Sequence, residues 1–140
     1  MKKIILNKCY GGFGLSKEGY ELYAKKKGLK LISYNSKIEN GKFIYRKTDK
    51  EDIFNHYFTK DLGDNVEISD EDYEKYHLYL REEAREDKTL IEVVEELGEK
   101  ASGMCGELKV VEIPDNAHYV IDEYDGIETI YYSEAEIKEK

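Results

Sequence analysis

The stretch that decides the fold is Tyr-Val-Ile-Asp-Glu-Tyr-Asp-Gly-Ile-Glu-Thr-Ile-Tyr-Tyr, residues 119–132. Tyr119–Tyr124 and Ile127–Tyr132 are rich in aromatic and β-branched residues, which favour strands. Between them lies Asp125-Gly126, a dipeptide that tolerates the positive φ angles of a tight hairpin turn. The stretch therefore predicts two antiparallel strands joined by a two-residue turn.

A second hairpin is predicted around Asn40-Gly41, with Leu29–Tyr34 and Lys42–Arg46 as its arms. Further strands are expected at Lys2–Asn7, Tyr57–Lys60 and Leu108–Ile113. Two hairpins make the sheet mostly antiparallel. One parallel pair is expected at the N-terminus, where the first strand is followed by a helix and another strand.

Three helices are expected, at 16–28, 69–84 and 87–103. Ser16 is a good N-cap for the first, and Gly28 is a natural C-terminal residue. The third has the clearest apolar stripe, from Leu90 to Ala101. Helices that are separate from hairpins indicate an α+β fold, with a mostly antiparallel sheet of about six strands and two to three helices packed against it. The 140 residues suit a single domain, 1–140, with a charged tail at 133–140 that is expected to fray.

No apolar run approaches the roughly 20 residues of a membrane helix, so no membrane association is expected. The N-terminal Met-Lys-Lys-Ile-Ile-Leu is too short for the core of a signal peptide, which predicts a cytoplasmic protein. The two cysteines, Cys9 and Cys105, would then be thiols, and a disulfide between them is the alternative.

Charge is distributed unevenly along the chain, whose net charge is −9. Residues 1–60 hold 14 Lys and Arg against 6 Asp and Glu, whereas residues 61–99 hold 4 against 15. A basic part that binds an anion, or an acidic part that binds a basic protein, would explain the asymmetry. Alternatively, the two parts face each other within the fold or across a dimer. Direct binding of nucleic acid is not expected.

The candidate site is the glycine-rich run Cys-Tyr-Gly-Gly-Phe-Gly-Leu-Ser, residues 9–16, between the first strand and the first helix. It lacks the spacing of a Walker loop or of the dinucleotide fingerprint. Its backbone amides would form a nest for a phosphate or carboxylate, with aromatic side chains stacking on a ring. The alternative is a tight strand-to-helix turn with aromatic residues in the core. The predicted ligand-binding residues are Lys8, Cys9, Tyr10, Gly11, Gly12, Phe13, Gly14, Ser16 and Arg46.

No complete catalytic or metal-binding motif is present, and no cofactor is expected. Cys9 precedes a helix, where a thiol is more acidic, but a nucleophile also needs a base, and none of His56, His77 and His118 is near it in sequence. The cysteines and histidines do not show metal-ligand spacing. The 13 tyrosines suit binding surfaces and favour a homo-oligomer.

Three segments resemble a family of small proteins of tailed phages and prophages. They are Asn-Lys-Cys-Tyr-Gly-Gly-Phe-Gly-Leu-Ser at 7–16, Val-Val-Glu-Glu-Leu-Gly-Glu-Lys-Ala at 93–101, and Leu-Lys-Val-Val-Glu-Ile-Pro-Asp at 108–115 with Ile-Asp-Glu-Tyr-Asp-Gly at 121–126. Against this pattern, 64–86 looks like a variable helical insert. The end at 131–140 departs from the more basic, Trp-containing ends of the family.

The resemblance implies a phage accessory protein in the cytoplasm of a host cell, and it implies no catalytic residues. Phage proteins of this size often counter host defence, some by sequestering nucleotide-derived signals. The first hypothesis is therefore a non-enzymatic protein that binds a small anionic, nucleotide-like ligand at the glycine-rich run. The second is an inhibitor that binds a host protein through the acidic face of Glu95, Glu96 and Glu99. The third is an enzyme that uses Cys9.

Overall fold

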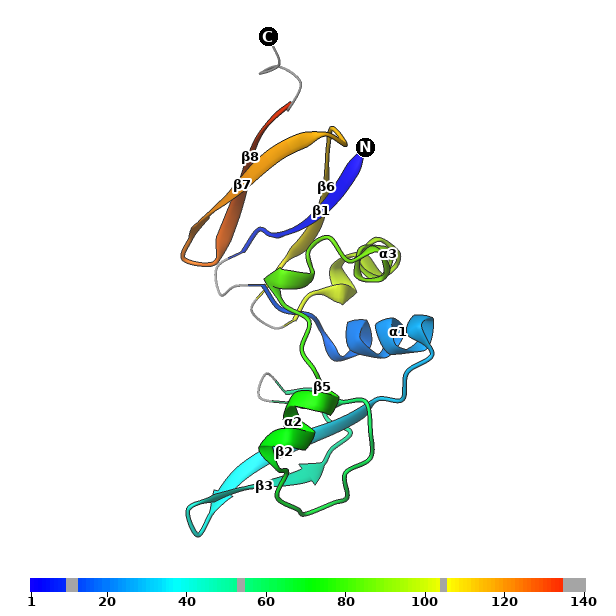
Figure 1. Ribbon diagram of the computed structural model, residues 1–140, viewed down its shortest axis with the longest axis vertical. Coiled ribbons are helices and arrows are strands. Elements are labelled where there is room, and N and C mark those ends of the chain that lie inside the picture. Colours follow the sequence, from blue (N-terminus) through cyan, green and yellow to red (C-terminus); the bar gives the residue numbers. More distant parts are fainter. Residues whose placement is uncertain (10–12, 53–54, 104–105, 135–140) are drawn as a thin grey trace. The chain divides into compact units, whose positions relative to one another are not determined.

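A computed structural model describes residues 1–9, 13–52, 55–103 and 106–134 (Figure 1). It confirms the α+β class, because the described chain combines three α-helices with strands that pair in antiparallel sheets. The strands are β1 (Lys2–Asn7), β2 (Ile32–Glu39), β3 (Lys42–Lys47), β4 (His56–Phe58), β5 (His77–Leu78), β6 (Leu108–Ile113), β7 (Ala117–Tyr124) and β8 (Ile127–Glu134). The helices are α1 (Lys17–Lys27), α2 (Asp70–Tyr76) and α3 (Lys88–Leu97), with the short 3₁₀ helices η1 (Glu82–Ala84) and η2 (Gly98–Ala101).

The strands form three separate sheets, where the sequence predicted one. Their orders are β1-β6, β3-β2-β4-β5 and β7-β8, and every strand pairing in the described part of the chain is antiparallel. The predicted parallel pair at the N-terminus is therefore wrong. β1 pairs instead with β6, from Lys2 opposite Ile113 to Asn7 opposite Leu108. The apolar run in β1 was enough to predict a strand, but which strand it pairs with depends on packing between residues that are far apart in sequence.

Both predicted hairpin turns are confirmed. Asn40 and Gly41 have φ angles of 53° and 77°, and Asp125 and Gly126 have φ angles of 52° and 94°. Positive φ at both central residues matches the right-handed twist of the flanking strands. β8 continues to Glu134, two residues into the stretch predicted as a tail, and 135–140 lie outside the described residues.

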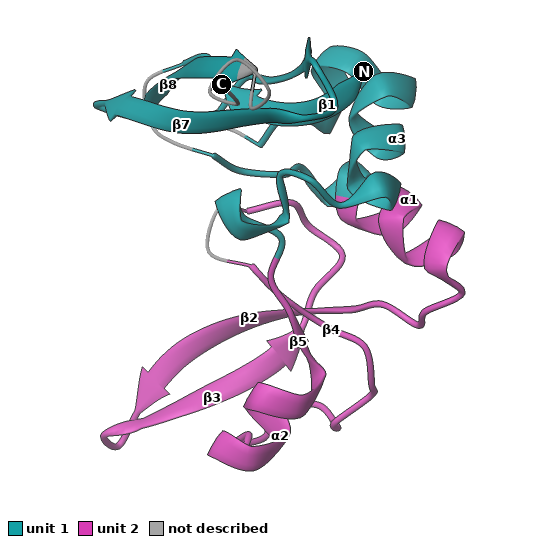
Figure 2. Cartoon of the chain, turned by 45° about the horizontal axis from the view of Figure 1, so that its top comes forward, with its two compact units in different colours: residues 1–19, 80–140 teal, residues 20–79 magenta. Residues whose placement is uncertain are grey.

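The chain divides into two compact units (Figure 2). Unit 1 comprises 1–19 and 80–140, and unit 2 comprises 20–79. The single domain stays a prediction, and each unit is described by itself. Every helix in the described ranges is too short or too polar to cross a lipid bilayer.

Unit 1 has its core between the β1-β6 ladder and the β7-β8 hairpin. Its buried residues are Ile4, Leu6, Ile113 and Ala117, and Val111, Tyr119, Ile121 and Ile130 pack against them. Helix α3 is capped by Asp87, whose carboxylate accepts hydrogen bonds from the amides of Thr89 and Leu90. The apolar face of α3 is buried, as its stripe predicted, through Leu90, Ile91, Val93 and Val94.

Unit 2 is built on an aromatic core. Tyr34, Tyr45 and Phe58 are buried on the four-stranded sheet, and Tyr73 and Tyr76 of α2 pack against them. The predicted helix 69–84 is wrong beyond Tyr76, because the backbone becomes extended and forms β5 and then η1. Helical spacing of the tyrosines was consistent with a longer helix, but pairing of β5 with β4 replaces it. The stretch 64–86 is therefore only partly helical.

Candidate functional site

The described ends of the glycine-rich run, which follows β1 in sequence, lie beside residues 102–103 and 107, shortly before β6. The amide of Lys8 donates to the carbonyl of Glu107 over 2.8 Å, directly past the last pair of the β1-β6 ladder. Further along, the amide of Gly103 donates to the carbonyl of Gly14 over 2.9 Å. Leu15 forms an isolated bridge with Ser102. Both ends of the run are therefore fixed to the same neighbouring loop.

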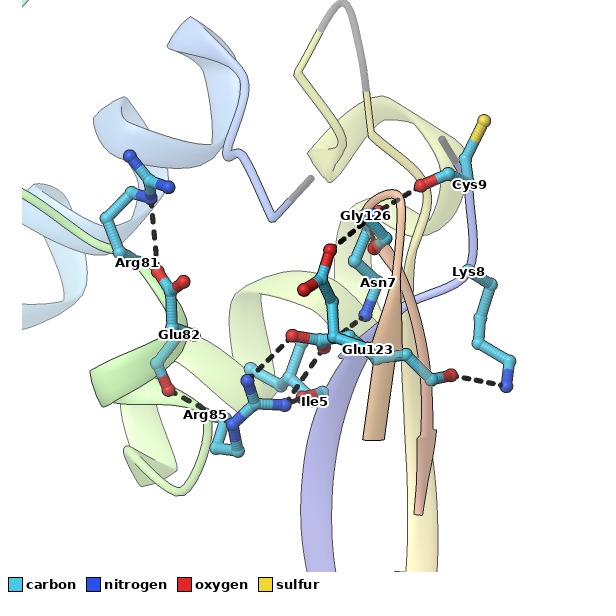
Figure 3. Close-up of polar contacts among 10 residues, drawn as sticks. Ile5, Asn7, Lys8, Cys9, Arg81, Glu82, Arg85, Glu123 and Gly126 are labelled. Carbon is cyan, nitrogen blue, oxygen red and sulfur yellow. Dashed lines mark hydrogen bonds and ion pairs between the residues drawn. The ribbon is translucent and has the colours of Figure 1, made fainter. Parts of the chain in front are cut away.

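Asn7, the last residue of β1, is fully buried and links three segments (Figure 3). Its side-chain amide nitrogen donates to the carbonyls of Cys9 over 2.7 Å and Gly126 over 2.6 Å. Its side-chain oxygen accepts from the amide of Glu107 over 2.8 Å. Burying a side-chain amide costs free energy unless its donors and its acceptor are hydrogen-bonded, as they are here. Asn7 thus sets the direction in which the chain leaves the sheet.

A buried ion pair lies next to Asn7. The guanidinium of Arg85 contacts both carboxylate oxygens of Glu128 over 3.0 and 2.9 Å, and the two side chains are 12% and 7% exposed. One Glu128 oxygen also accepts from the amide of Asn7 over 2.9 Å, and Arg85 donates to the carbonyl of Ile5 over 3.0 Å. Burial opposes the charge of Arg85, but hydrogen bonding and attraction to Glu128 outweigh burial and raise the guanidinium's pKa.

Three predicted residues, Lys8, Cys9 and Phe13, lie beside Asn7 and this ion pair. The Lys8 ammonium donates to the carbonyl of Glu128 over 3.0 Å, which is a neutral acceptor. Cys9 has a free thiol, which points away from the Asn7 amide in Figure 3. Phe13 is only 6% exposed, and its ring lies 5.6 Å from the Arg85 guanidinium. Phe13 therefore packs as a core residue in this structure, as the alternative interpretation expected.

Gly14 and Ser16 have different surroundings in the structure. A Cβ atom built on Gly14 meets no heavy atom within 4 Å, so the backbone there faces open space. The buried Ser16 hydroxyl donates to the carbonyl of Lys100 over 2.6 Å and accepts from the amide of Gly19 over 3.0 Å. Ser16 thus caps α1, as predicted, and its hydroxyl is already used within the protein.

Tyr10, Gly11 and Gly12 lie outside the described residues. Arg46 belongs to unit 2, on β3, where it contacts Glu39 over 2.7 Å and Asn65 over 2.9 Å. The structure therefore places Lys8, Cys9, Phe13, Gly14 and Ser16 in unit 1. Arg46 lies in unit 2 and makes its contacts there.

Part of the charge asymmetry is neutralised inside the fold. In unit 2, the basic strand β3 pairs with acidic residues that follow it: Lys47 contacts Asp61 over 2.7 Å, and Lys42 contacts Glu67 over 3.7 Å. In unit 1, Glu95 on the acidic face of α3 contacts Lys3 over 2.7 Å. These pairs agree with the interpretation that basic and acidic parts face each other, and they reduce the acidic charge that α3 would offer a host protein.

Sequence reasoning did not identify Asn7, Arg85 and Glu128. Asn7 carried a signal, because a polar residue directly after the apolar run Ile4–Leu6 must find partners if it is buried. Arg85 carried none, since it lies among other charged residues, and neither did Glu128, whose neighbours on the hairpin strand, Ile127 and Thr129, do not indicate a buried charge. Among the described residues, no group of three His, Cys, Asp or Glu is placed to bind a metal ion.

Comparison with family models, with curated proteins and with solved structures found no match to this chain. The resemblance to phage proteins therefore depends on the quoted segments alone. The function has to be argued from the geometry of the site.

Proposed function

We propose that this protein is a non-enzymatic phage accessory protein that binds a small anionic, nucleotide-like ligand at the glycine-rich run 9–16 and the adjacent Lys8. The observation that carries the proposal is the buried Asn7 amide, which fixes the carbonyl of Cys9 at the start of the run. Location in the host cytoplasm, assembly into a homo-oligomer and a role in sequestering a defence signal belong to the same proposal.

Fixed ends favour binding by a short loop. The run is joined to the neighbouring loop at Lys8 and again at Gly14 and Ser16, through backbone hydrogen bonds of 2.8 to 2.9 Å. Ordering a loop at the moment of binding costs conformational entropy, and fixing the ends of the loop beforehand lowers that cost. A simple strand-to-helix turn would not need both ends to be held in this way. The fixed ends therefore support a binding role for the run.

The charge of Lys8 and the open space at Gly14 also support an anionic ligand. The Lys8 ammonium is exposed and donates to a neutral carbonyl, so this contact leaves its positive charge uncompensated. Gly14 offers a backbone that a ligand can approach closely, because nothing lies within 4 Å of its Cβ position. A phosphate close to Lys8 would gain a charge-assisted hydrogen bond.

The proposal is tested by binding measurements on matched variants. Nucleoside monophosphates, cyclic dinucleotides and inorganic phosphate would be titrated into the protein by calorimetry, and a native mass spectrum of protein from infected cells would identify a copurified ligand. Lys8→Gln removes the charge but keeps a donor, and we expect it to weaken binding about tenfold. Lys109→Gln removes the same charge from an exposed position of β6 and should leave affinity unchanged.

A steric variant tests the backbone contact separately. Gly14→Ala adds a methyl group where the protein has open space, so the fold should persist while the ligand is kept at a distance. If no probe binds and the native mass is that of the protein alone, the binding proposal is wrong. Binding that survives both Lys8→Gln and Gly14→Ala would place the ligand elsewhere.

A further inference from the structure

Two histidines of unit 2 lie side by side on the aromatic face of its sheet. His56 begins β4 and His77 begins β5, and their ring centroids are 6.1 Å apart. Both side chains are partly buried. Two imidazolium ions at this separation would repel each other and would also lose hydration.

His77 is surrounded by aromatic rings. It stacks on Tyr73 of α2 with centroids 4.4 Å apart and on Tyr79 at 5.4 Å, and Phe58 of β4 lies 5.2 Å away. Burial, and secondarily the neighbouring His56, lowers the pKa of His77 to about 4. The ring is therefore neutral at pH 7.

His56 has a similar environment on its other side. Its Nε2 atom lies 3.1 Å from the hydroxyl of Ser36 on β2, and its ring meets Tyr45 of β3 edge-on, 5.4 Å between centroids. Burial lowers the pKa of His56 as well. Ser36 and Tyr45 are neutral at pH 7, so neither offsets a positive charge on His56.

The charged groups on the packed elements are directed to other partners. Lys47 of β3 pairs with Asp61, and Lys60 and Lys75 lie over the ring of Tyr76. On α2, Asp70, Glu71 and Glu74 are exposed, and Asp72 offers its amide to the capping hydroxyl of Ser69. The rings and hydroxyl recorded around the two histidines in the described part of unit 2 are uncharged at neutral pH.

The segment that carries His77 is attached to the sheet by few backbone contacts. β5 has two residues, and its register pairs Tyr57 with Leu78 and Phe58 with His77. Just before it, the amide of Thr59 donates to the carbonyl of Tyr76 over 2.9 Å. A short edge strand of this kind opens more easily than a central strand.

We propose that His56 and His77 form an acid-sensitive latch that keeps α2 and β5 on the edge of the sheet and releases them when the imidazoles are protonated. The latch is independent of the proposed ligand site, which lies in unit 1. Opening would expose the second edge of β4 for pairing with another chain.

The direction of the effect follows from linkage. When the segment opens, His77 regains its ordinary affinity for protons near pH 6.5 and His56 loses the cover of His77, whereas in the closed state each binds a proton only at lower pH. The open state therefore gains protons first as the pH falls, so closure weakens from about pH 6.5 down to the folded pKa of His77, about 4.

Hydrogen exchange on the full chain tests the latch. Protection factors, corrected for the intrinsic rate at each pH, would be compared at pH 7.5 and 5.0. We expect amides in 70–79 to lose protection about tenfold or more, while Ile5 and Leu6 in β1 keep theirs. Equal changes in both regions, or unchanged protection in 70–79, would overturn the latch.

Variants assign the effect to the two imidazoles. His77→Phe keeps an aromatic ring without a titrating group, and His56→Gln keeps a polar partner for Ser36. Each should reduce the pH-dependent loss of protection, whereas His118→Gln on the exposed part of β7 should not. Should a variant not fold, an NMR titration of the wild-type imidazoles decides: His77 should titrate near pH 4, and a midpoint at or above the ordinary value of about 6.5 contradicts the proposal.

Discussion

The carboxylate of Glu128 receives two hydrogen bonds from the guanidinium of Arg85, over 3.0 and 2.9 Å, across a separation of 43 residues. The pair is almost fully buried, and Asn7 donates its backbone amide to the same carboxylate. This contact joins β1, the residue that follows η1, and β8, next to the point where the glycine-rich run begins.

Glu128→Gln should strongly destabilise the protein. It leaves Arg85 as a buried charge without its counterion, and such a loss typically costs about 3 to 5 kcal/mol. Urea unfolding at pH 7 measures the change. Glu39→Gln is the control, because it breaks the exposed pair with Arg46 and should change the unfolding free energy by less than about 0.5 kcal/mol. Equal effects of the two substitutions would contradict a structural role for the buried pair.

Asn7→Asp should destabilise the protein in a pH-dependent manner. The substitution preserves shape but replaces a donor with an oxygen that faces the carbonyls of Cys9 and Gly126, at a cost of about 3 kcal/mol at pH 7. Protonation of the new carboxyl restores a donor, so the deficit relative to wild type should shrink as the pH falls below 5. Urea unfolding of both proteins at pH 7 and pH 4.5 measures it, and a constant deficit would count against this geometry.

Gly19→Ala should destabilise α1, although alanine is the better helix former. A Cβ atom at this position would lie 2.7 Å from two carbons of the buried Leu15 side chain. Overpacking of this kind costs about 1 to 3 kcal/mol, which exceeds the gain of about 1 kcal/mol in helix propensity. A double-mutant cycle with Leu15→Ala checks the cause, because the added methyl should then be tolerated. Gly14→Ala, where space is open, is the matched control.

Ser16→Ala should lower stability by about 1 to 2 kcal/mol. It removes the cap on the amide of Gly19 and the hydrogen bond to the carbonyl of Lys100. Thermal unfolding provides the measurement, with Ser69→Ala at the exposed start of α2 as the comparison. A smaller loss for Ser16→Ala than for Ser69→Ala would mean that burial adds nothing to the cap.

The local features of the fold could be predicted from the sequence. Asn40-Gly41 and Asp125-Gly126 were identified as turns because positive φ angles depend on the residues themselves. The apolar stripe of α3 and the cap at Ser16 were predicted because they, too, depend on residues that are close in sequence. The end of α2 at Tyr76 was not predicted, because it is caused by the pairing of β5 with β4.

The candidate site stays a prediction. The sequence placed it between the first strand and the first helix, and the structure shows that the described ends of this stretch, at Lys8 and Gly14, are hydrogen-bonded to neighbouring backbone. A ligand role for Phe13 is not supported by its burial, and ligand binding at the run stays a proposal.

The sequence by itself determined the α+β class, both hairpin turns and the position of the glycine-rich run, since backbone preferences and apolar periodicity are properties of neighbouring residues. Only the tertiary structure decided that β1 pairs with β6, that Asn7, Arg85 and Glu128 meet, and that His56 lies beside His77. These contacts join residues about 20 to 120 positions apart. They exist because a buried polar or aromatic group must find a partner in the folded chain, and no local pattern specifies which one.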